Sequence, residues 1–228
     1  MPLDQAERLE LLDWKRRIFD LYRGVRADDD PARAWRTWRA VRDDLIANHP
    51  QSPVDELRRD HVSPSYFEYD PAARVHAEVV PLKLEHAALP MSRDDGTQFS
   101  RFGNAVFELY GTELALGLYW LDAYGGGVFL SFTDETSGEL SYGAGRYLLD
   151  TVKGADLGTV DGKLVLDFNF AFNPSCAYDP KMGLSPRAAR EPASGRRQRR
   201  RAAARPPVMA RAGLEPATPR FSAVCSTS

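Results

Sequence analysis

Hydrophobic positions recur at helical spacing in the first fifty residues. Across residues 3–26, apolar side chains stand three, four or seven positions apart with charged residues between them: Leu9, Leu12, Ile18, Phe19, Tyr22 and Val25. This spacing predicts an amphipathic helix. Asp30 and Pro31 suit the N-cap and the first turn of a second helix, whose apolar stripe consists of Trp35, Trp38, Val41 and Leu45. We expect this helix to end near Ala47, ahead of Pro50.

From Tyr66 onward the period of the pattern changes to two, which is typical of strands. Alternating apolar residues predict six strands, around residues 75–79, 105–109, 114–120, 128–132, 142–152 and 164–172. The glycines at 125–127 and the sequence Thr136-Ser137-Gly138 fit the short turns that join antiparallel neighbours. The predicted fold is therefore α+β and mainly β, with two N-terminal helices followed by an antiparallel β-barrel or sandwich.

Pattern and charge divide the chain into three parts. We expect a helical segment over 1–48, an antiparallel β-domain over 49–180 and a disordered tail over 181–228. The tail holds ten Arg and one Lys against two Glu, about +9, whereas residues 1–180 carry about −11 and the whole chain −2. An acidic body repels nucleic-acid phosphates and anionic lipids. We therefore expect neither nucleic acid nor membranes as partners.

The composition of the chain allows predictions about the cellular location of the protein and about bound metals or cofactors. No run of eighteen apolar residues occurs and the N-terminus lacks an apolar signal core, so we expect a cytoplasmic protein without a transmembrane helix. Two cysteines are too few for a disulfide scaffold or a four-cysteine zinc site. The four histidines show no metal-ligand spacing. We expect no metal site and no cofactor.

Candidate chemistry is concentrated in polar residues near the last strands. Asp167 and Asn169 share one face of the strand predicted over 164–172, opposite Leu and Phe side chains. Arg146 has a planar fork that matches a carboxylate, and we expect it within pairing distance of Asp167 or Asp134. The ligand-binding candidates are Arg146, Asp167, Asn169, Asp134, Tyr142 and Asn173. These side chains either pair with one another to fix the strand ends or hold a small anionic ligand.

Two classes of function follow from this cluster. The first is a non-catalytic domain that binds a small anionic ligand or a protein partner. The alternative is a hydrolase-like enzyme that uses Asp167 or Asp134, with Arg146 as the charge stabiliser. Other motifs give weaker evidence of function. The sequence Gly143-Ala144-Gly145 does not indicate a dinucleotide-binding site, because it lacks the third glycine and the helix that such a site requires. Cys176 has no identifiable cation or helix start that would make its thiol reactive.

Three motifs carry a resemblance to a known family. They read FTDETSG at 132–138, YGAGRYL at 142–148, and LDFN at 166–169 followed by NPSCAY at 173–178. The upstream sequences NHPQSP at 48–53 and YFEYDP at 66–71 fit the same pattern. Together they resemble the domain-of-unknown-function 1684 family of bacterial and archaeal proteins, over roughly residues 35–180. The resemblance implies no catalytic residues, because no activity is assigned to the family.

The tail departs from that family after Tyr178. The family continues with a segment similar to CPxxPPENRL and a further strand, whereas residues 181–193 read KMGLSPRAAREPA. Codons for this segment exist that encode such a continuation when they are read one base later. Residues 211–222 resemble a peptide that arises when transfer-RNA genes are translated by mistake. We therefore expect a shifted, non-native frame from Lys181 and a body without its last strand; the rival interpretation is a nucleic-acid-binding arm around 196–201.

Overall fold

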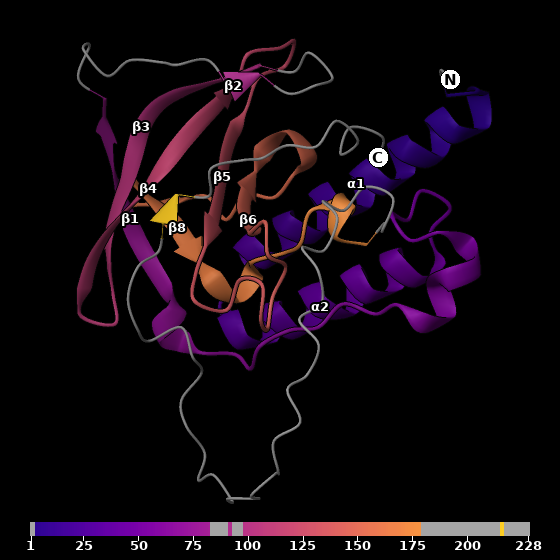
Figure 1. The fold of residues 1–228 in the computed structure, drawn as a ribbon, viewed down its shortest axis with the longest axis horizontal. Helices are drawn as coiled ribbons and strands as arrows, with labels where there is room; N and C mark the ends of the chain where they lie inside the picture. Colours follow the sequence, from indigo (N-terminus) through magenta and orange to yellow (C-terminus); the bar gives the residue numbers. More distant parts are fainter. Residues whose placement is uncertain (1–2, 83–90, 93–97, 179–214, 217–228) are drawn as a thin grey trace, which may run out of the picture.

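The computed structural model describes residues 3–82, 91–92, 98–178 and 215–216. Two helices open the chain and lie side by side, α1 (Gln5–Ala27) and α2 (Pro31–Asn48) (Figure 1). Both confirm the predicted helices, to within two residues at each end. Asp30 caps α2 as expected, because its carboxylate accepts hydrogen bonds from the backbone N–H groups of Ala32 and Arg33.

A curled antiparallel sheet, a half-barrel, follows the helices (Figure 1). Its strand order in the described part of the chain is β6-β5-β4-β3-β1-β8-β7, with β2 added to β3 and β9 added to β5. All of these pairings are antiparallel, as predicted. The strands are β1 (Arg74–Pro81), β2 (Met91–Ser92), β3 (Gln98–Leu109), β4 (Thr112–Leu121), β5 (Val128–Thr133), β6 (Arg146–Asp150), β7 (Thr159–Val160), β8 (Lys163–Asp167) and β9 (Glu215–Pro216).

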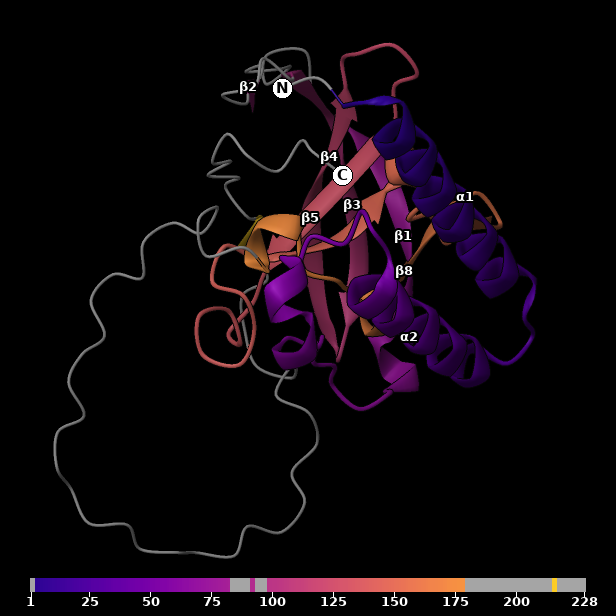
Figure 2. The ribbon, with the colours of Figure 1, turned by 90° about the vertical axis from the view of Figure 1, so that its right-hand side faces the viewer.

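Two apolar clusters hold these layers together. The first fills the concave side of the sheet and includes Leu116, Leu118, Leu130, Phe132, Leu148, Leu166 and Phe168. The second joins the helices to the sheet, since Trp35 and Trp38 of α2 pack with Val165 of β8 and with Phe170. Figure 2 shows α1 and α2 beside β1 and β8. Full burial of each large apolar side chain contributes about 1.5–3 kcal/mol, so this contact fixes α2 firmly against the sheet.

The last two predicted strands are shorter than the pattern indicated. The strand expected over 142–152 begins only at Arg146. The strand expected over 164–172 ends at Asp167, where the chain turns into the short 3₁₀ helix η5 (Phe168–Phe170). The Asp167 carboxylate accepts a hydrogen bond of 3.1 Å from the backbone N–H of Asn169. Such local side-chain bonds compete with the strand ladder, and here they end it.

The predictions for the tail concern residues that lie largely outside the described ranges. Of residues 181–228, the structure describes only the two residues of β9, so the predicted disorder, the shifted frame and the missing last strand stay predictions. None of the helices in the described ranges combines the length and the hydropathy that a membrane crossing requires.

Candidate functional site

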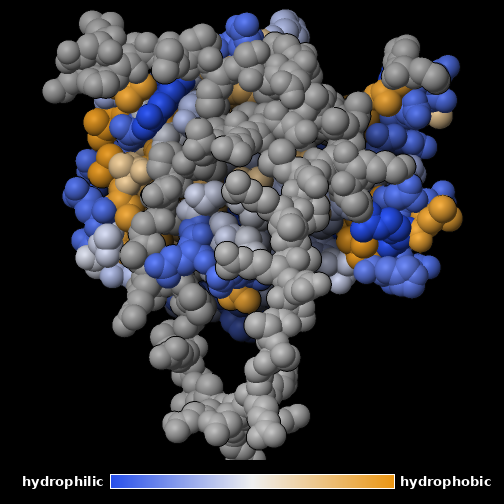
Figure 3. All heavy atoms as spheres, in the orientation of Figure 1, coloured by the Kyte–Doolittle hydropathy of each residue, from blue (hydrophilic) through white to orange (hydrophobic). Residues whose placement is uncertain are grey.

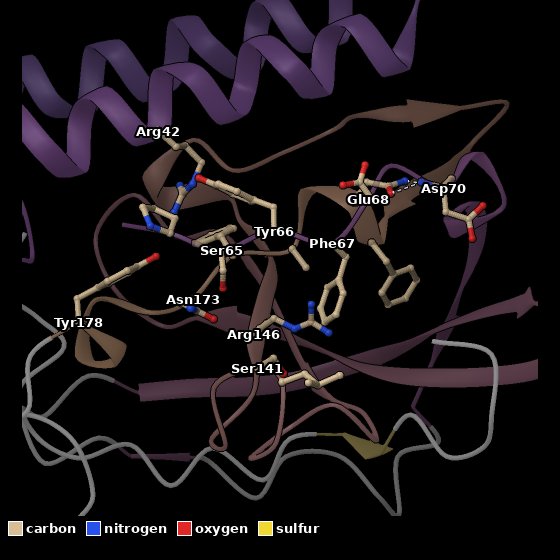
Figure 4. A pocket seen from close by; sticks show the side chains of 16 residues that line it. Arg42, Ser65, Tyr66, Phe67, Glu68, Asp70, Ser141, Arg146, Asn173 and Tyr178 are labelled. Atoms are coloured by element: carbon tan, nitrogen blue, oxygen red, sulfur yellow. Dashed lines mark hydrogen bonds between the residues drawn. The ribbon is translucent and has the colours of Figure 1, made fainter. Parts of the chain in front are cut away.

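A pocket of about 220 Å³ opens between α2 and the sheet (Figure 4). Its walls come from Arg42 on α2, from the segment 64–70, from Leu140 and Ser141 ahead of β6, from Arg146 at the start of β6, and from the segment 168–178. Typical ligand pockets enclose about 300–1,000 Å³, so this one lies below that range. Its size therefore limits the pocket to a compact small molecule.

Asn169 holds the wall formed by residues 64–70 in place. Its amide oxygen accepts from the backbone N–H of Asp70, and its amide N–H donates to the Asp70 carbonyl, both over 2.8 Å. The Asp70 carboxylate accepts in turn from the Tyr110 hydroxyl over 2.7 Å and from the backbone N–H of Ala72 over 2.9 Å. The prediction that Asp167 and Asn169 share one face of a strand is wrong, because β8 ends at Asp167 and Asn169 lies in η5; their side chains nevertheless meet, since the Asn169 amide donates to Asp167 over 2.7 Å.

Asp167 acts as a buried support behind this wall. Its side chain is fully buried and lies 3.3 Å from Nη1 of Arg74, the residue paired with it across β1 and β8. Burial raises the pKa of the Asp167 carboxyl, while hydrogen bonds from Asn169 and the charge of Arg74 oppose that shift. In the described ion pairs, Asp167 pairs with Arg74 and not with Arg146.

Arg146 forms the second buried ion pair of the site. Its Nη2 lies 2.5 Å from Oδ2 of Asp134, which confirms one of the two predicted pairings. The guanidinium lies over the rings of Phe132 and Phe67, 5.0 and 5.3 Å from their centroids. Burial lowers the pKa of Arg146, and Asp134 opposes this shift. Gly145 allows the close approach, because a Cβ there would lie 2.5 Å from the Phe132 carbonyl oxygen.

Two guanidinium groups in the pocket each keep an unused donor. The Nε–H groups of Arg42 and Arg146 are buried and have no hydrogen-bond partner among the described residues. Arg42 lies over the rings of Trp38 and Phe172, at 5.0 and 4.7 Å from their centroids. None of the described ion pairs includes Arg42. Other nitrogens of the two groups are engaged, since Arg42 hydrogen-bonds to the Tyr178 hydroxyl and Arg146 to Asp134. Of six such buried atoms in the described ranges, the two Nε atoms are the ones that belong to pocket residues.

The labelled side chains show how these donors are arranged (Figure 4). Arg42 lies at one end of the pocket, near Tyr178, and Arg146 lies farther along it, next to Phe67. Asn173 lies between the two arginines. Burial raises the pKa of the Tyr178 hydroxyl, and the charge of Arg42 opposes this shift. The hydroxyl is therefore neutral and can donate a hydrogen bond at neutral pH.

The six predicted site residues take different places around the pocket. Arg146, Asn169 and Asn173 line it. Asp134 and Asp167 do not line it: the first pairs with Arg146 and the second supports Asn169. The Tyr142 hydroxyl lies 3.8 Å from Sγ of Cys176, also outside the lining.

Two carboxylates line the pocket, Glu68 and Asp70, and neither was predicted. Asp70 accepts two hydrogen bonds within the protein, as described above. Glu68 is exposed at the rim. Among the described residues, no group of three or more His, Cys, Asp or Glu side chains could hold a metal ion.

Arg42 is the main pocket residue that the sequence interpretation missed. The sequence does contain a signal that could have identified Arg42. It lies seven residues after Trp35, four after Trp38 and three before Leu45. It thus occupies the apolar stripe of α2, at a position where an apolar residue is expected. A cation in such a stripe indicates either a buried partner or a polar cavity. Tyr66 and Phe67, which also line the pocket, carry no comparable sequence signal.

Exposed apolar side chains gather elsewhere on the surface, over β1 and β3 (Figure 3). They include Val79, Val80 and Phe102, each about 40% exposed. Nothing in the described ranges indicates what covers them. The pocket is therefore the stronger candidate for a functional site.

The family model for "Protein of unknown function (DUF1684)" matches residues 61–187, more than half of the 228 residues. The chain belongs to this family. The match confirms the resemblance seen in the sequence, although it begins later than residue 35. A similar solved structure is the solution NMR structure of an uncharacterised protein from Haloarcula marismortui, which is 31% identical. The alignment covers 70% of this chain and 90% of that one, with a TM-score of 0.44. No curated protein matches this member of the DUF1684 family.

Proposed function

We propose that the protein binds a small anionic ligand in the pocket, through Arg42 and Arg146. The observation that supports this is the pair of buried Nε–H donors without acceptors. Nearly all buried polar groups in folded proteins have a hydrogen-bond partner, and an unpaired one costs about 1–3 kcal/mol. A ligand with acceptor oxygens would remove this cost at both arginines.

Charge complementarity favours an anion over a neutral ligand. Hydrogen bonds from a guanidinium to a carboxylate or phosphate are roughly twice as strong as those between neutral groups. Arg42 takes part in none of the described ion pairs, and its position over Trp38 and Phe172 fixes the plane of its fork. A fork held in this way loses little entropy when it binds a planar anion.

The other functions considered from the sequence have less support. The hydrolytic alternative relies on Asp167 or Asp134, and neither lines the pocket. Both carboxylates already accept hydrogen bonds inside the protein. A protein partner would need to place a side chain or terminus in a space of about 220 Å³. A small molecule fits this space directly, and we therefore favour it.

Thermal denaturation of the full chain tests the proposal with sodium phosphate, acetate and benzoate at constant ionic strength. We expect at least one of these anions to raise the melting temperature saturably, because a ligand at about 100 times its Kd adds about 2.7 kcal/mol of stability. Arg42→Gln should abolish the effect. Arg39→Gln is the matched control, since Arg39 also stacks on aromatic rings of the same region, Trp35 and Tyr66, but does not line the pocket.

Two results would contradict the proposal. One is the absence of saturable stabilisation by any of the three anions. The other is an equal loss of stabilisation in Arg39→Gln and Arg42→Gln, because this would show that the anions act through the general charge of α2 and not through the pocket.

A further inference from the structure

We infer that the ligand is a monocarboxylate with a flat apolar body, and not a phosphate ester. The inference rests on the proposed function and names the class of ligand that the same pocket accepts. Two independent features carry it, the balance of charge around the pocket and the nature of its walls.

Two guanidinium groups and two carboxylates line the pocket, and only one of the two guanidinium groups is in a described ion pair. Arg146 is neutralised by Asp134 at 2.5 Å. Asp43, beside Arg42 in the sequence, accepts a hydrogen bond of 2.8 Å from the Tyr66 hydroxyl in the pocket wall. Glu68 and Asp70 line the pocket itself. A monocarboxylate is matched by the one charge of Arg42, whereas the second charge of a phosphate dianion would face these carboxylates without a further unpaired pocket cation among the described residues.

The two arginines therefore have different roles. Of the two pocket arginines, Arg42 takes part in none of the described ion pairs, and we assign it to the ligand carboxylate. Arg146 already shares its charge with Asp134. It keeps an Nε–H donor for a neutral acceptor on the other part of the ligand.

Aromatic rings make up much of the remaining wall. Five of them line the pocket: Tyr66, Phe67, Phe168, Phe172 and Tyr178. Ring faces and edges pack best against flat apolar groups, with ring centroids 4.5–7 Å apart in typical aromatic pairs. A planar body between these rings would gain more contact than a puckered ring or a short aliphatic acid of the same charge.

Isothermal titration of the full chain with four probes separates these features. Benzoate has the flat body and one charge, cyclohexanecarboxylate has a puckered body of similar size, acetate lacks the body, and phenyl phosphate is mostly a dianion above its second pKa of about 6. At pH 7.5 and about 0.15 M salt, we expect benzoate to bind at least about tenfold tighter than each of the others, a difference of about 1.4 kcal/mol. Arg42→Gln should abolish benzoate binding, and Arg39→Gln should retain it.

Glu68→Gln provides a test of the charge balance at an exposed position. Removing this rim carboxylate should strengthen benzoate binding about threefold and phenyl phosphate binding about ninefold, because the Coulomb energy doubles with the charge of the ligand and the fold-change is therefore squared. Equal effects on the two probes would contradict the charge argument.

The remaining outcomes distinguish the inference from the function on which it rests. If phenyl phosphate binds as tightly as benzoate or tighter, and Arg42→Gln abolishes that binding, the anion site stands and the inferred ligand class is wrong. If cyclohexanecarboxylate or acetate equals benzoate, the flat apolar body is wrong. If none of the four probes binds, the proposed function itself is wrong.

Discussion

Replacement of Asp134 by Asn would leave the Arg146 guanidinium buried without its counter-charge. The two side chains are 7% and 8% exposed, and their charged groups approach to 2.5 Å. Two unit charges about 4 Å apart attract by about 4 kcal/mol at an effective dielectric constant of about 20. Removal of one partner from a buried pair typically costs about 3–5 kcal/mol. We expect Asp134→Asn to lower the free energy of unfolding by about 3–5 kcal/mol.

The surface of α1 and α2 offers a matched control for this variant. Arg17 and Asp44 also approach to 2.5 Å, but their side chains are 39% and 48% exposed. Exposed pairs contribute about 0–1 kcal/mol, so Asp44→Asn should cost no more than about 1 kcal/mol. The two pairs have the same N···O distance, so the difference between the variants reports burial together with the further hydrogen bonds that Asp134 accepts from Thr136 and Ser137 and Asp44 accepts from Asn48.

Urea denaturation at pH 7, followed by tryptophan fluorescence and circular dichroism, measures both variants. The comparison is valid where the denaturant slope is unchanged, because the midpoint then reports stability alone. A cost for Asp134→Asn no greater than that for Asp44→Asn would refute the assignment of a buried, charged pair. Replacement of both residues, Arg146→Met with Asp134→Asn, should recover part of the loss, since it removes the unpaired buried charge and keeps an oxygen that can accept from Thr136 and Ser137.

Further variants test the scaffold around the pocket. Burial raises the pKa of Asp167 above its ordinary 3.8, so its contribution to stability is complete below that pH and is lost as the pH rises through the folded-state pKa. The stability of Asp167→Asn relative to the native protein should therefore increase from about pH 3 to about pH 7 in urea titrations, and a decrease would contradict this. Gly145→Ala should cost more than about 1 kcal/mol of stability, because Gly145 has a φ of +95° and approaches Phe132 closely. Its control is Gly24→Ala, which has open space in α1 and should stabilise the protein by about 0.5–1 kcal/mol. Thermal melts that rank the two variants alike would be evidence against backbone strain at residue 145. Asp30→Ala should cost about 1 kcal/mol by removal of the α2 cap, measured in the same melts.

The helices could be predicted closely because their signals are local. Asp30 and Pro31 mark the start of α2, and both the cap and the first turn form as the sequence indicates. The strand over 164–172 was predicted too long because alternation continues past Asp167, where the side chain of that residue bonds to the backbone and turns the chain. The hydrophobic period alone does not reveal that a side chain competes with the neighbouring strand for backbone hydrogen bonds.

The candidate site could be predicted only in part, since its partners are distant in the sequence. The fork of Arg146 predicted a carboxylate partner, and Asp134 is that partner. Which of two carboxylates would pair with it depends on strand register, and register places Arg74, not Arg146, opposite Asp167. Arg42 reaches the pocket from α2, and no local pattern places that helix over the sheet. The shifted frame from Lys181 stays a prediction that resequencing of the gene would test.

Asn169 links the support of the pocket to its lining. Its side chain bonds to Asp167 and to the backbone of Asp70, and its carbonyl accepts from the indole N–H of Trp35 on α2 over 3.1 Å. These contacts tie the segment 64–70, η5 and α2 to one another. Arg42, by contrast, comes from α2, and Arg146 comes from β6, with an unpaired donor on each. A ligand that accepts from both would therefore join the helical layer to the sheet across a pocket whose walls are already in place, and its binding energy would be little reduced by reorganisation of the protein.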